Sequence, residues 1–269
     1  MSIVSVVIAD HMGKRLVSIA PDYVHHAGST MKLAVMIELF RMFDARTLRP
    51  DSSLMVHNDF KSVVDSRPFE LEVAFDNHAP LYRYVGQTVP VATLIELMVA
   101  ESSNLATNLL FDLIDLQSMQ ATLAELGAEH TQVLRRVEDR TAHHRGIDNR
   151  TCAEDLVRLM LALSLGTAAS ELSCRIMFAI LRRQRHRDGI PAGLPRDVPC
   201  ANLTGWLSFM FHDIAYIGDP GSGYVACVMQ SDIRDSAEAR ATAQAVAHDL
   251  WGARDVPDEM QWRVSGRAH

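Results

Sequence analysis

The stretch Gly28-Ser29-Thr30-Met31-Lys32 stands directly before an apolar run that extends to Asp44. Hydrophobic residues recur in this run at three- and four-residue intervals, at Leu33, Met36, Ile37, Phe40 and Phe43. The spacing predicts an amphipathic helix over residues 29–44 with one buried face. Ser29 would open this helix, close to unpaired backbone N–H groups and the positive end of the helix dipole. Lys32 would lie one turn later on the same side.

Ser29 and Lys32 together have the chemistry of a nucleophile and its base. A lysine in an otherwise apolar turn is partly desolvated, so its pKa falls, and a neutral amine beside a hydroxyl can accept its proton. A serine N-cap followed by a solvated lysine produces the same short pattern, because serine is a favoured cap and short motifs recur by chance. Further motifs must decide between these interpretations.

Composition restricts the class of protein. The chain has 269 residues, of which 48% are hydrophobic and 22% charged, and its net charge is -7. These values predict a globular protein with one large core or two interlocked lobes. The negative charge argues against nucleic acid as a partner. No stretch reaches the roughly 18 apolar residues of a membrane span, and the apolar run at residues 3–9 lacks the basic lead-in of a signal peptide. We therefore expect a cytoplasmic protein that acts on a small-molecule substrate.

The cysteines give no sign of a disulfide or metal framework. They are widely scattered, without a C-x-x-C pair or a histidine at zinc spacing, at Cys152, Cys174, Cys200 and Cys227. Structural thiols in a reducing compartment, with no metal or cofactor, are the expectation.

Strand patterns occur at both ends of the chain. Five segments rich in β-branched or alternating apolar residues are expected to be strands, at residues 3–9, 14–20, 202–209, 211–217 and 224–230. Gly13 lies in the loop after the first of them, where a positive φ is expected. Asp235 would cap a last helix that continues through Leu250. Because sheet edges require partners, the five strands are predicted to form one antiparallel sheet.

The middle of the chain has mostly helical periodicity. Helices are expected at residues 91–100, 104–114, 119–126 and 170–181, and after a capping box at Thr151-Cys152-Ala153-Glu154. Residues 45–90 contain four prolines and should form long loops with short elements. The predicted fold class is therefore α/β of the α+β type. Residues 1–28 plus 196–269 would form a sheet lobe and residues 29–195 an inserted helical lobe, with one catalytic cleft between them.

Two further short motifs carry polar groups to positions where a cleft is expected. Ser102 and Asn104 lie on the turn between two predicted helices, where a hydroxyl and an amide can relay a proton and hold a substrate carbonyl. Thr204-Gly205 lies on the first C-terminal strand, and a strand glycine allows a ligand or another backbone to approach closely. Alone, each motif is equally typical of an ordinary connector or strand.

In this order, S-x-x-K, S-x-N and T-G form the signature of class A β-lactamases and penicillin-binding proteins. The sequence therefore resembles the class A β-lactamase-like serine hydrolases of this superfamily over nearly its whole length. Residues 102–110, with the sequence SSNLATNLL, are similar to the corresponding family segment, as is Thr204-Gly205-Trp206 followed by His212-Asp213. The combination favours a catalytic Ser29 over a simple helix cap.

The resemblance implies roles for single residues. Ser29 would be the acylated nucleophile and a backbone oxyanion donor, Lys32 its base, and Ser102 the group that passes a proton to the leaving group. The substrate-binding residues would be Asn104, Leu203, Thr204, Gly205 and Trp206. Arg136-Val137-Glu138 is similar to the Arg-x-Glu of the family's omega loop, whose glutamate activates the deacylating water. A solvated loop carboxylate is the alternative for Glu138.

The third motif departs from the family, because Leu203 stands where a lysine is usual. A charge-assisted contact of this kind contributes about 1.5–3 kcal/mol, so we expect weak activity on ordinary penicillins. Substitutes could come from His212 or from the basic cluster of Arg182, Arg183, Arg185, His186 and Arg187. A solvated helix end and a satisfied strand histidine are the plainer interpretations.

A second departure concerns deacylation. Ala142 stands where the family has an asparagine that helps to hold the hydrolytic water, so deacylation should be slow or use Asp139, His143 or His144. The family's usual helix before the first strand is also missing.

The leading hypothesis is a serine hydrolase that forms an acyl-enzyme and cleaves an amide, ester or β-lactam bond. The alternatives are an acyl transferase or tailoring enzyme in small-molecule biosynthesis, and a ligand-binding or sensor protein without turnover. Substrate identity and oligomeric state stay open at this stage.

Overall fold

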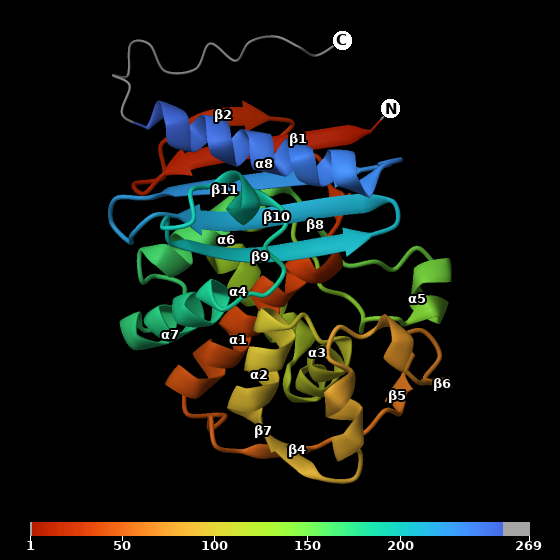
Figure 1. The fold of residues 1–269 in the computed structure, drawn as a ribbon. Helices are drawn as coiled ribbons and strands as arrows, with labels where there is room; N and C mark the ends of the chain where they lie inside the picture. Colours follow the sequence, from red (N-terminus) through yellow and green to blue (C-terminus); the bar gives the residue numbers. More distant parts are fainter. Residues whose placement is uncertain (1, 255–269) are drawn as a thin grey trace.

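The computed structural model describes residues 2–254, and its centre is a five-stranded antiparallel sheet with helices on both faces (Figure 1). The strand order is β2-β1-β11-β10-β9. The strands are β1 (Ile3–Asp10), β2 (Arg15–Ile19), β9 (Cys200–Leu207), β10 (Met210–Ile217) and β11 (Tyr224–Ser231). β1 pairs with β11, so the two ends of the chain meet in the sheet as predicted. Gly13, in the β1–β2 turn, has the expected positive φ of 87°.

One face of the sheet is covered by α8 (Ser236–Ala253). Small side chains recur on this helix at four-residue intervals, at Ala239, Ala243 and Ala247, and all are buried against the strands. Asp235 caps the helix as predicted, because its carboxylate accepts hydrogen bonds from the backbone N–H groups of Ala237 and Glu238. The small residues allow the helix to lie close to the sheet.

The other face packs against the helical part of the chain. Its helices are α1 (Lys32–Asp44), α2 (Val91–Ala100), α3 (Asn104–Leu110), α4 (Leu116–Glu125), α6 (Ala153–Ser164) and α7 (Glu171–Arg182). α6 lies against β1, β10 and β11, and α7 lies against β9. Successive strand side chains alternate between the faces, which places Leu203 in this larger core and Trp206 on the α8 side.

Two local predictions were wrong. Residues Gly28–Met31 form a 3-10 turn, and α1 begins only at Lys32, because both the backbone N–H and the hydroxyl of Thr30 bond to the Ala27 carbonyl and tighten the chain. Thr151 is not part of a capping box. Its hydroxyl lies 2.8 Å from that of Thr131, and Glu154 binds Arg15 instead.

The remaining segments are short, as the proline-rich composition of residues 45–90 predicted. They are β4 (Ser53–Met55), β5 (Phe60–Lys61), β6 (Pro68–Phe69) and β7 (Thr88–Pro90), with 3-10 turns at Val73–Phe75 and Ala79–Tyr84. Two further elements lie near the cavity described below. β3 (His25–His26) pairs with β8 (Arg150–Thr151), and α5 (Arg140–His144) lies at one edge of the molecule in Figure 1.

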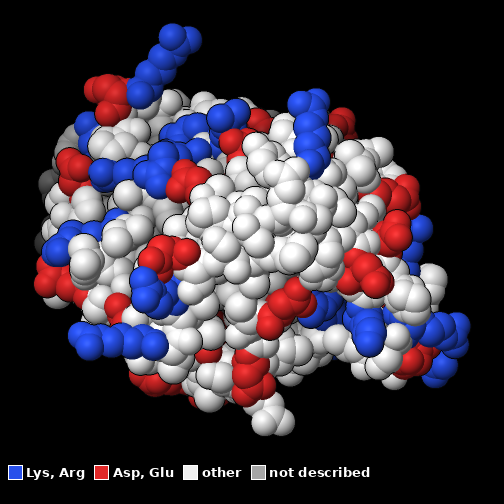
Figure 2. All heavy atoms as spheres, turned by 90° about the horizontal axis from the view of Figure 1, so that it is seen from below, with Lys and Arg blue, Asp and Glu red and all other residues white. Residues whose placement is uncertain are grey.

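The surface charges and the lengths of the helices bear on which partners the protein can have. Figure 2 shows Lys and Arg side chains interspersed with Asp and Glu around an uncharged area on the face seen from below. None of the helices within residues 2–254 is long and apolar enough to cross a membrane. The division into a sheet lobe and a helical lobe stays a prediction, and residues 255–269 of the predicted sheet lobe lie outside the described residues.

Candidate active site

Ser29 lies in the 3-10 turn Gly28–Met31, directly beside the edge strand β9. A Cβ atom at Gly205 would lie 2.9 Å from the backbone nitrogen of Ser29 and 3.1 Å from that of Thr30. Since real Cβ atoms do not come this close to backbone atoms, only glycine lets the strand lie against the turn at this point. The Ser29 N–H is therefore next to the strand edge, at the start of α1, where negative charge is favoured.

Three polar side chains form a continuous hydrogen-bonded chain at Ser29. The Ser102 hydroxyl lies 3.1 Å from Ser29 Oγ, and Lys32 Nζ lies 3.0 Å from Ser102 Oγ. Among the described residues, no hydrogen bond joins Lys32 directly to Ser29. A proton that leaves Ser29 therefore has a short route to the amine through Ser102.

Lys32 is completely buried, and its surroundings change its protonation. Nζ donates to the Ser102 carbonyl at 2.9 Å and approaches Asn104 Oδ1 at 3.4 Å. Burial lowers the pKa of the Lys32 amine to about 7, and the negative charge of Asp76 partly opposes this change. A large fraction of the amine is therefore neutral near pH 7 and can accept a proton.

Ser102 has a strained backbone that aims its polar groups at Lys32. Its φ is 59°, a left-handed conformation that a serine rarely adopts. The next residue, Ser103, caps α3 through a hydrogen bond from the Ala106 N–H, which fixes the turn. In this conformation the carbonyl and hydroxyl of Ser102 both accept from the same ammonium group.

Glu138 is connected to the same network through Asn104. The Asn104 amide lies 3.4 Å from Lys32 Nζ through Oδ1 and 3.4 Å from Glu138 Oε1 through Nδ2. Partial burial raises the pKa of the Glu138 carboxyl, and its φ of 62° is a second left-handed conformation. Val137, the residue before Glu138, is held by Asn108 on α3. The Val137 N–H donates to Asn108 Oδ1 at 2.8 Å, and Asn108 Nδ2 donates to the Val137 carbonyl at 2.9 Å.

Of this network, Ser29, Asn104 and Glu138 face a cavity of about 510 Å³, whereas Lys32 and Ser102 lie behind them, fully buried. Ser29, Asn104, Glu138 and Trp206 line it, together with a set of apolar side chains, Phe75, Val137, Leu207 and Phe209. The cavity thus combines a serine hydroxyl, a carboxyl and an amide with a largely apolar wall, as is common for small-molecule sites.

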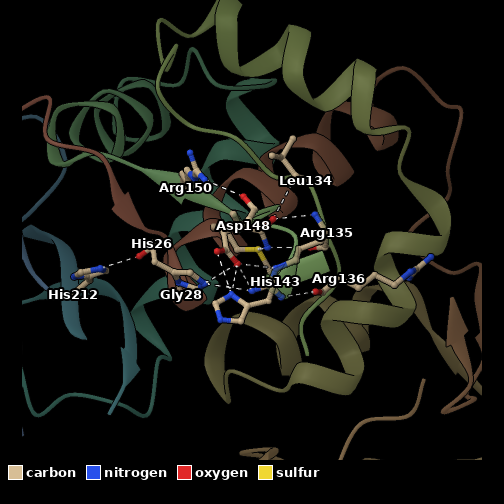
Figure 3. Close-up of polar contacts among 12 residues, drawn as sticks. His26, Gly28, Leu134, Arg135, Arg136, His143, Asp148, Arg150 and His212 are labelled. Atoms are coloured by element: carbon tan, nitrogen blue, oxygen red, sulfur yellow. Dashed lines mark hydrogen bonds and ion pairs between the residues drawn. The ribbon is translucent and has the colours of Figure 1, made fainter. Parts of the chain in front are cut away.

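A second polar cluster lies at the cavity, where His26, Arg135 and His143 line it, and of these residues only His143 was a candidate from the sequence. The Arg135 guanidinium lies 2.8 Å from Asp148 Oδ1, and His143 Nδ1 lies 2.9 Å from the same oxygen. Figure 3 shows these side chains converging with His26 beside Gly28. His26 lies in the two-residue strand β3, His143 in the short helix α5, and Arg135 and Asp148 in loops, and elements this short give no periodic signal.

The side chains of Leu203 and Thr204 are fully buried, and neither of them lines the cavity. Leu203 packs into the larger core. The Thr204 hydroxyl donates to Asp213 at 3.1 Å, in a buried network with Asn202, and burial raises the pKa of the Asp213 carboxyl to about 7. From this strand, Trp206 and Leu207 line the cavity, and Gly205 lies against the backbone of Ser29.

The basic cluster considered as a substitute for the missing lysine is bound elsewhere. Arg183 forms a bidentate ion pair with Glu96, and Arg185 pairs with Glu101 at 2.8 Å. Arg182 lies 3.5 Å from Asp219, and Arg187 donates to the Cys200 carbonyl at 3.3 Å. The His186 ring packs on Trp206 with 4.5 Å between ring centroids.

His212 supplies no positive charge either. Its side chain is fully buried in β10, where Nδ1 accepts from the Gln230 N–H and Nε2 lies 3.0 Å from the His26 carbonyl (Figure 3). Burial lowers the pKa of this imidazole to about 3, so the ring is neutral. His212 is therefore a strand histidine whose two ring nitrogens both have hydrogen-bond partners, which was the alternative interpretation of this residue.

Of the groups considered as alternatives to Glu138, Asp139 and His143 line the cavity, and both have other partners; His143 contacts Asp148. Asp139 is buried, and its oxygens cap α5 and accept from the Val63 N–H. His144 does not line the cavity, whereas His143 does. Ala142 is fully buried, so this position offers no polar group to a water beside Glu138.

Comparison with known proteins gives one family. The model of the beta-lactamase enzyme family matches residues 2–253. No curated protein matches the sequence significantly.

Solved structures with low sequence identity share the fold. A beta-lactamase from Sphaerobacter thermophilus is 22% identical with a TM-score of 0.78, covering 95% of this chain and 93% of that one. A beta-lactamase from Xanthomonas campestris is 24% identical with a TM-score of 0.80, covering 93% and 91%. A mutant of PBP-A, in an acyl-enzyme complex with penicillin G, is 21% identical with a TM-score of 0.78, covering 94% and 90%.

Proposed function

Because the chain belongs to the beta-lactamase enzyme family, we propose that it is a serine hydrolase that forms an acyl-enzyme on Ser29. The observation that carries this proposal is the hydrogen-bonded chain from Ser29 Oγ through Ser102 Oγ to the buried Lys32 amine. A nucleophile, a relay and a base whose pKa lies near 7 are the parts that acylation requires. The acyl-enzyme described for the PBP-A mutant supports the same chemistry on this fold.

In the acylation step, Ser29 Oγ attacks the substrate carbonyl, and its proton passes through Ser102 to Lys32. The Ser29 backbone N–H at the start of α1 stabilises the oxyanion that develops. Ser102 then donates a proton to the leaving nitrogen or oxygen and recovers one from Lys32, so that the acyl group remains on Ser29.

In the deacylation step, Glu138 accepts a proton from water as the water oxygen attacks the acyl carbonyl. The bond between the acyl carbon and Ser29 Oγ then breaks, and the proton returns to Ser29 Oγ, which releases the acid and restores the enzyme. The Asn104 amide lies between Glu138 and Lys32 and can orient this water or the acyl group. The raised pKa of the Glu138 carboxyl suits a general base, since it brings proton affinity closer to neutral pH. No metal or cofactor takes part in these steps.

The cavity favours an acyl group with an apolar side chain, because Phe75, Val137, Leu207 and Phe209 form much of its wall. The usual carboxylate partner is missing, since Leu203 is buried, and the arginines that line the cavity are already paired, Arg135 with Asp148 and Arg140 with Glu72. Esters, amides or lactams without an obligatory carboxylate are therefore the proposed substrates, and ordinary penicillins should react slowly.

Steady-state hydrolysis tests this proposal. Wild-type protein and Ser29→Ala are assayed with aryl esters of apolar acids, matched amides, a penicillin and a neutral lactam. Turnover of the apolar esters by wild type, at least a thousandfold above Ser29→Ala, supports a serine hydrolase. Equal rates for both proteins would remove Ser29 from the reaction. A conjugate that appears only when an amine or alcohol is added would instead indicate an acyl transferase.

A sensor without turnover is the second candidate, and Ala142 favours it. This buried methyl side chain cannot hold a hydrolytic water beside Glu138. In a sensor, Ser29 would be acylated once and the adduct would persist. Repeated turnover with any substrate would exclude this function.

A further inference from the structure

A cluster of metal-binding side chain types lies outside the active-site cavity. The ligand atoms of Asp22, His130 and Cys152 all lie within 4.8 Å of one another. Asp22 is in the connection between β2 and β3, His130 follows α4, and Cys152 is the N-cap of α6. Three segments that are distant in sequence therefore meet at this point.

Asp155 lies beside this cluster and brings a second carboxylate to it, and one oxygen of that carboxylate lacks a hydrogen-bond partner among the described residues. Its side chain is 1% exposed, and its Oδ1 lies 3.7 Å from His130 Nδ1. Within the described residues, this oxygen has no hydrogen-bond partner of ordinary geometry. A buried carboxylate oxygen without a partner lowers the stability of the folded protein, and in native proteins such an atom usually binds an ion or a water molecule.

We propose that Asp22, His130, Cys152 and Asp155 form a structural binding site for zinc or a similar borderline divalent cation. A thiolate, an imidazole and carboxylates are a donor set that suits Zn²⁺, whereas Ca²⁺ and Mg²⁺ prefer oxygen alone. With bonds of roughly 2.0–2.3 Å, tetrahedral geometry places ligand atoms about 3.3–3.8 Å apart. The 3.7 Å between His130 and Asp155 fits this range. The Asp22 and His130 side chains are exposed, so other rotamers are open to them.

The surroundings orient the donors as the outer shell of a metal site does. Thr131 Oγ1 donates to Asp155 Oδ2 at 2.9 Å, which leaves Oδ1 for the ion, and Thr151 supports Thr131 at 2.8 Å. Arg158, the nearest cation on α6, donates to Glu154 at 3.0 Å and to the Gly127 carbonyl at 2.6 Å. On binding, the Cys152 thiol would release its proton to solvent.

The site would tie together the base of the loop that carries Glu138. Thr131 and Thr151 flank this loop, and the bridge between Gln132 and Arg150 closes it. Asp22 lies shortly before β3, which pairs with β8 at the same base. A cation held here would join the segment that precedes Ser29 to the loop and to α6, and would stabilise all three.

The test measures metal binding directly, without reference to activity. Chelator-treated protein is titrated with Zn²⁺ and with Co²⁺. Inductively coupled plasma mass spectrometry gives the metal content per chain, and thermal unfolding gives the melting temperature. One equivalent, a higher melting temperature and a thiolate-to-cobalt absorption band are expected. Cys152→Ser and His130→Ala should each weaken binding at least tenfold, and Thr131→Val by about 10- to 100-fold.

Matched controls separate this site from adventitious binding. Cys174→Ser removes another buried thiol and His144→Ala another exposed imidazole, and neither should change affinity. The proposal is overturned if wild type binds no stoichiometric metal, if the cobalt spectrum lacks a thiolate band, or if His130→Ala binds as tightly as wild type. None of these readouts depends on whether Ser29 is catalytic.

Discussion

The buried amine of Lys32 makes a quantitative prediction about stability. Its pKa falls from 10.5 to about 7 in the folded protein, which corresponds to about 5 kcal/mol at roughly 1.4 kcal/mol per unit. Between these two values the unfolded chain binds a proton that the native state has lost. The contribution of Lys32 to the free energy of unfolding therefore rises with pH across this window, by about 2 kcal/mol between pH 7 and pH 9.

The variant Lys32→Met removes this dependence, because methionine fills a similar volume and does not titrate. Urea unfolding of wild type and Lys32→Met at pH 7, 8 and 9 gives the difference in unfolding free energy at each pH. From pH 7 to pH 9, the unfolding free energy of wild type should increase by about 2 kcal/mol relative to that of Lys32→Met. Other titrating groups, including the four buried cysteines, are present in both proteins and cancel.

The exposed Lys61 provides the matched control, and Lys61→Met should unfold in parallel with wild type at every pH. The same amine should govern catalysis, so the acylation rate should rise to a plateau as pH increases through about 7. A free-energy difference between wild type and Lys32→Met that stays constant from pH 7 to pH 9 would refute the lowered pKa, and with it the assignment of Lys32 as a neutral base.

Three further substitutions test other parts of the site. Glu138→Gln should leave acylation intact and slow deacylation by roughly 10²–10⁴-fold, visible as a burst of product; an unchanged steady state would exclude Glu138 as the base. Leu203→Lys should lower the free energy of unfolding by about 3–5 kcal/mol relative to Leu203→Met and leave penicillin acylation slow, because this side chain enters the apolar core and not the cavity; a faster penicillin reaction would show that the missing charge limits the rate. Gly205→Ala should cost about 1–3 kcal/mol in urea unfolding and abolish acylation, because its Cβ meets the Ser29 nitrogen, whereas Gly252→Ala, with open space around it, should not destabilise the protein.

The sheet could be predicted from the sequence because its strands carry local signals. The β-branched runs at residues 3–9 and 14–20, and the three C-terminal strands, alternate with turn residues that mark their ends. Joining them into one sheet needed only the rule that edges require partners. The start of α1 could not be predicted, since the 3-10 turn depends on the Thr30 hydrogen bonds to Ala27.

The candidate site was only partly accessible from sequence. The motifs named Ser29, Lys32, Ser102 and Asn104, which the structure does bring together. The order of the proton route was not predictable, because it depends on the left-handed turn at Ser102.

Other features depend on contacts between distant segments. The burial of Thr204 with Asp213 across two strands has no local sequence signal. The same is true of the cluster around Cys152, whose members come from three separate segments.

The central claim is that Ser29 is a nucleophile that forms a covalent intermediate. An intact-mass time course with a reactive apolar ester and with a penicillin, on wild type and Ser29→Ala, tests it most directly. The account predicts an acyl adduct on wild type that forms quickly with the ester, forms slowly with the penicillin, and is absent from Ser29→Ala. An adduct of equal yield on Ser29→Ala, or no adduct on wild type with either reagent, would contradict it.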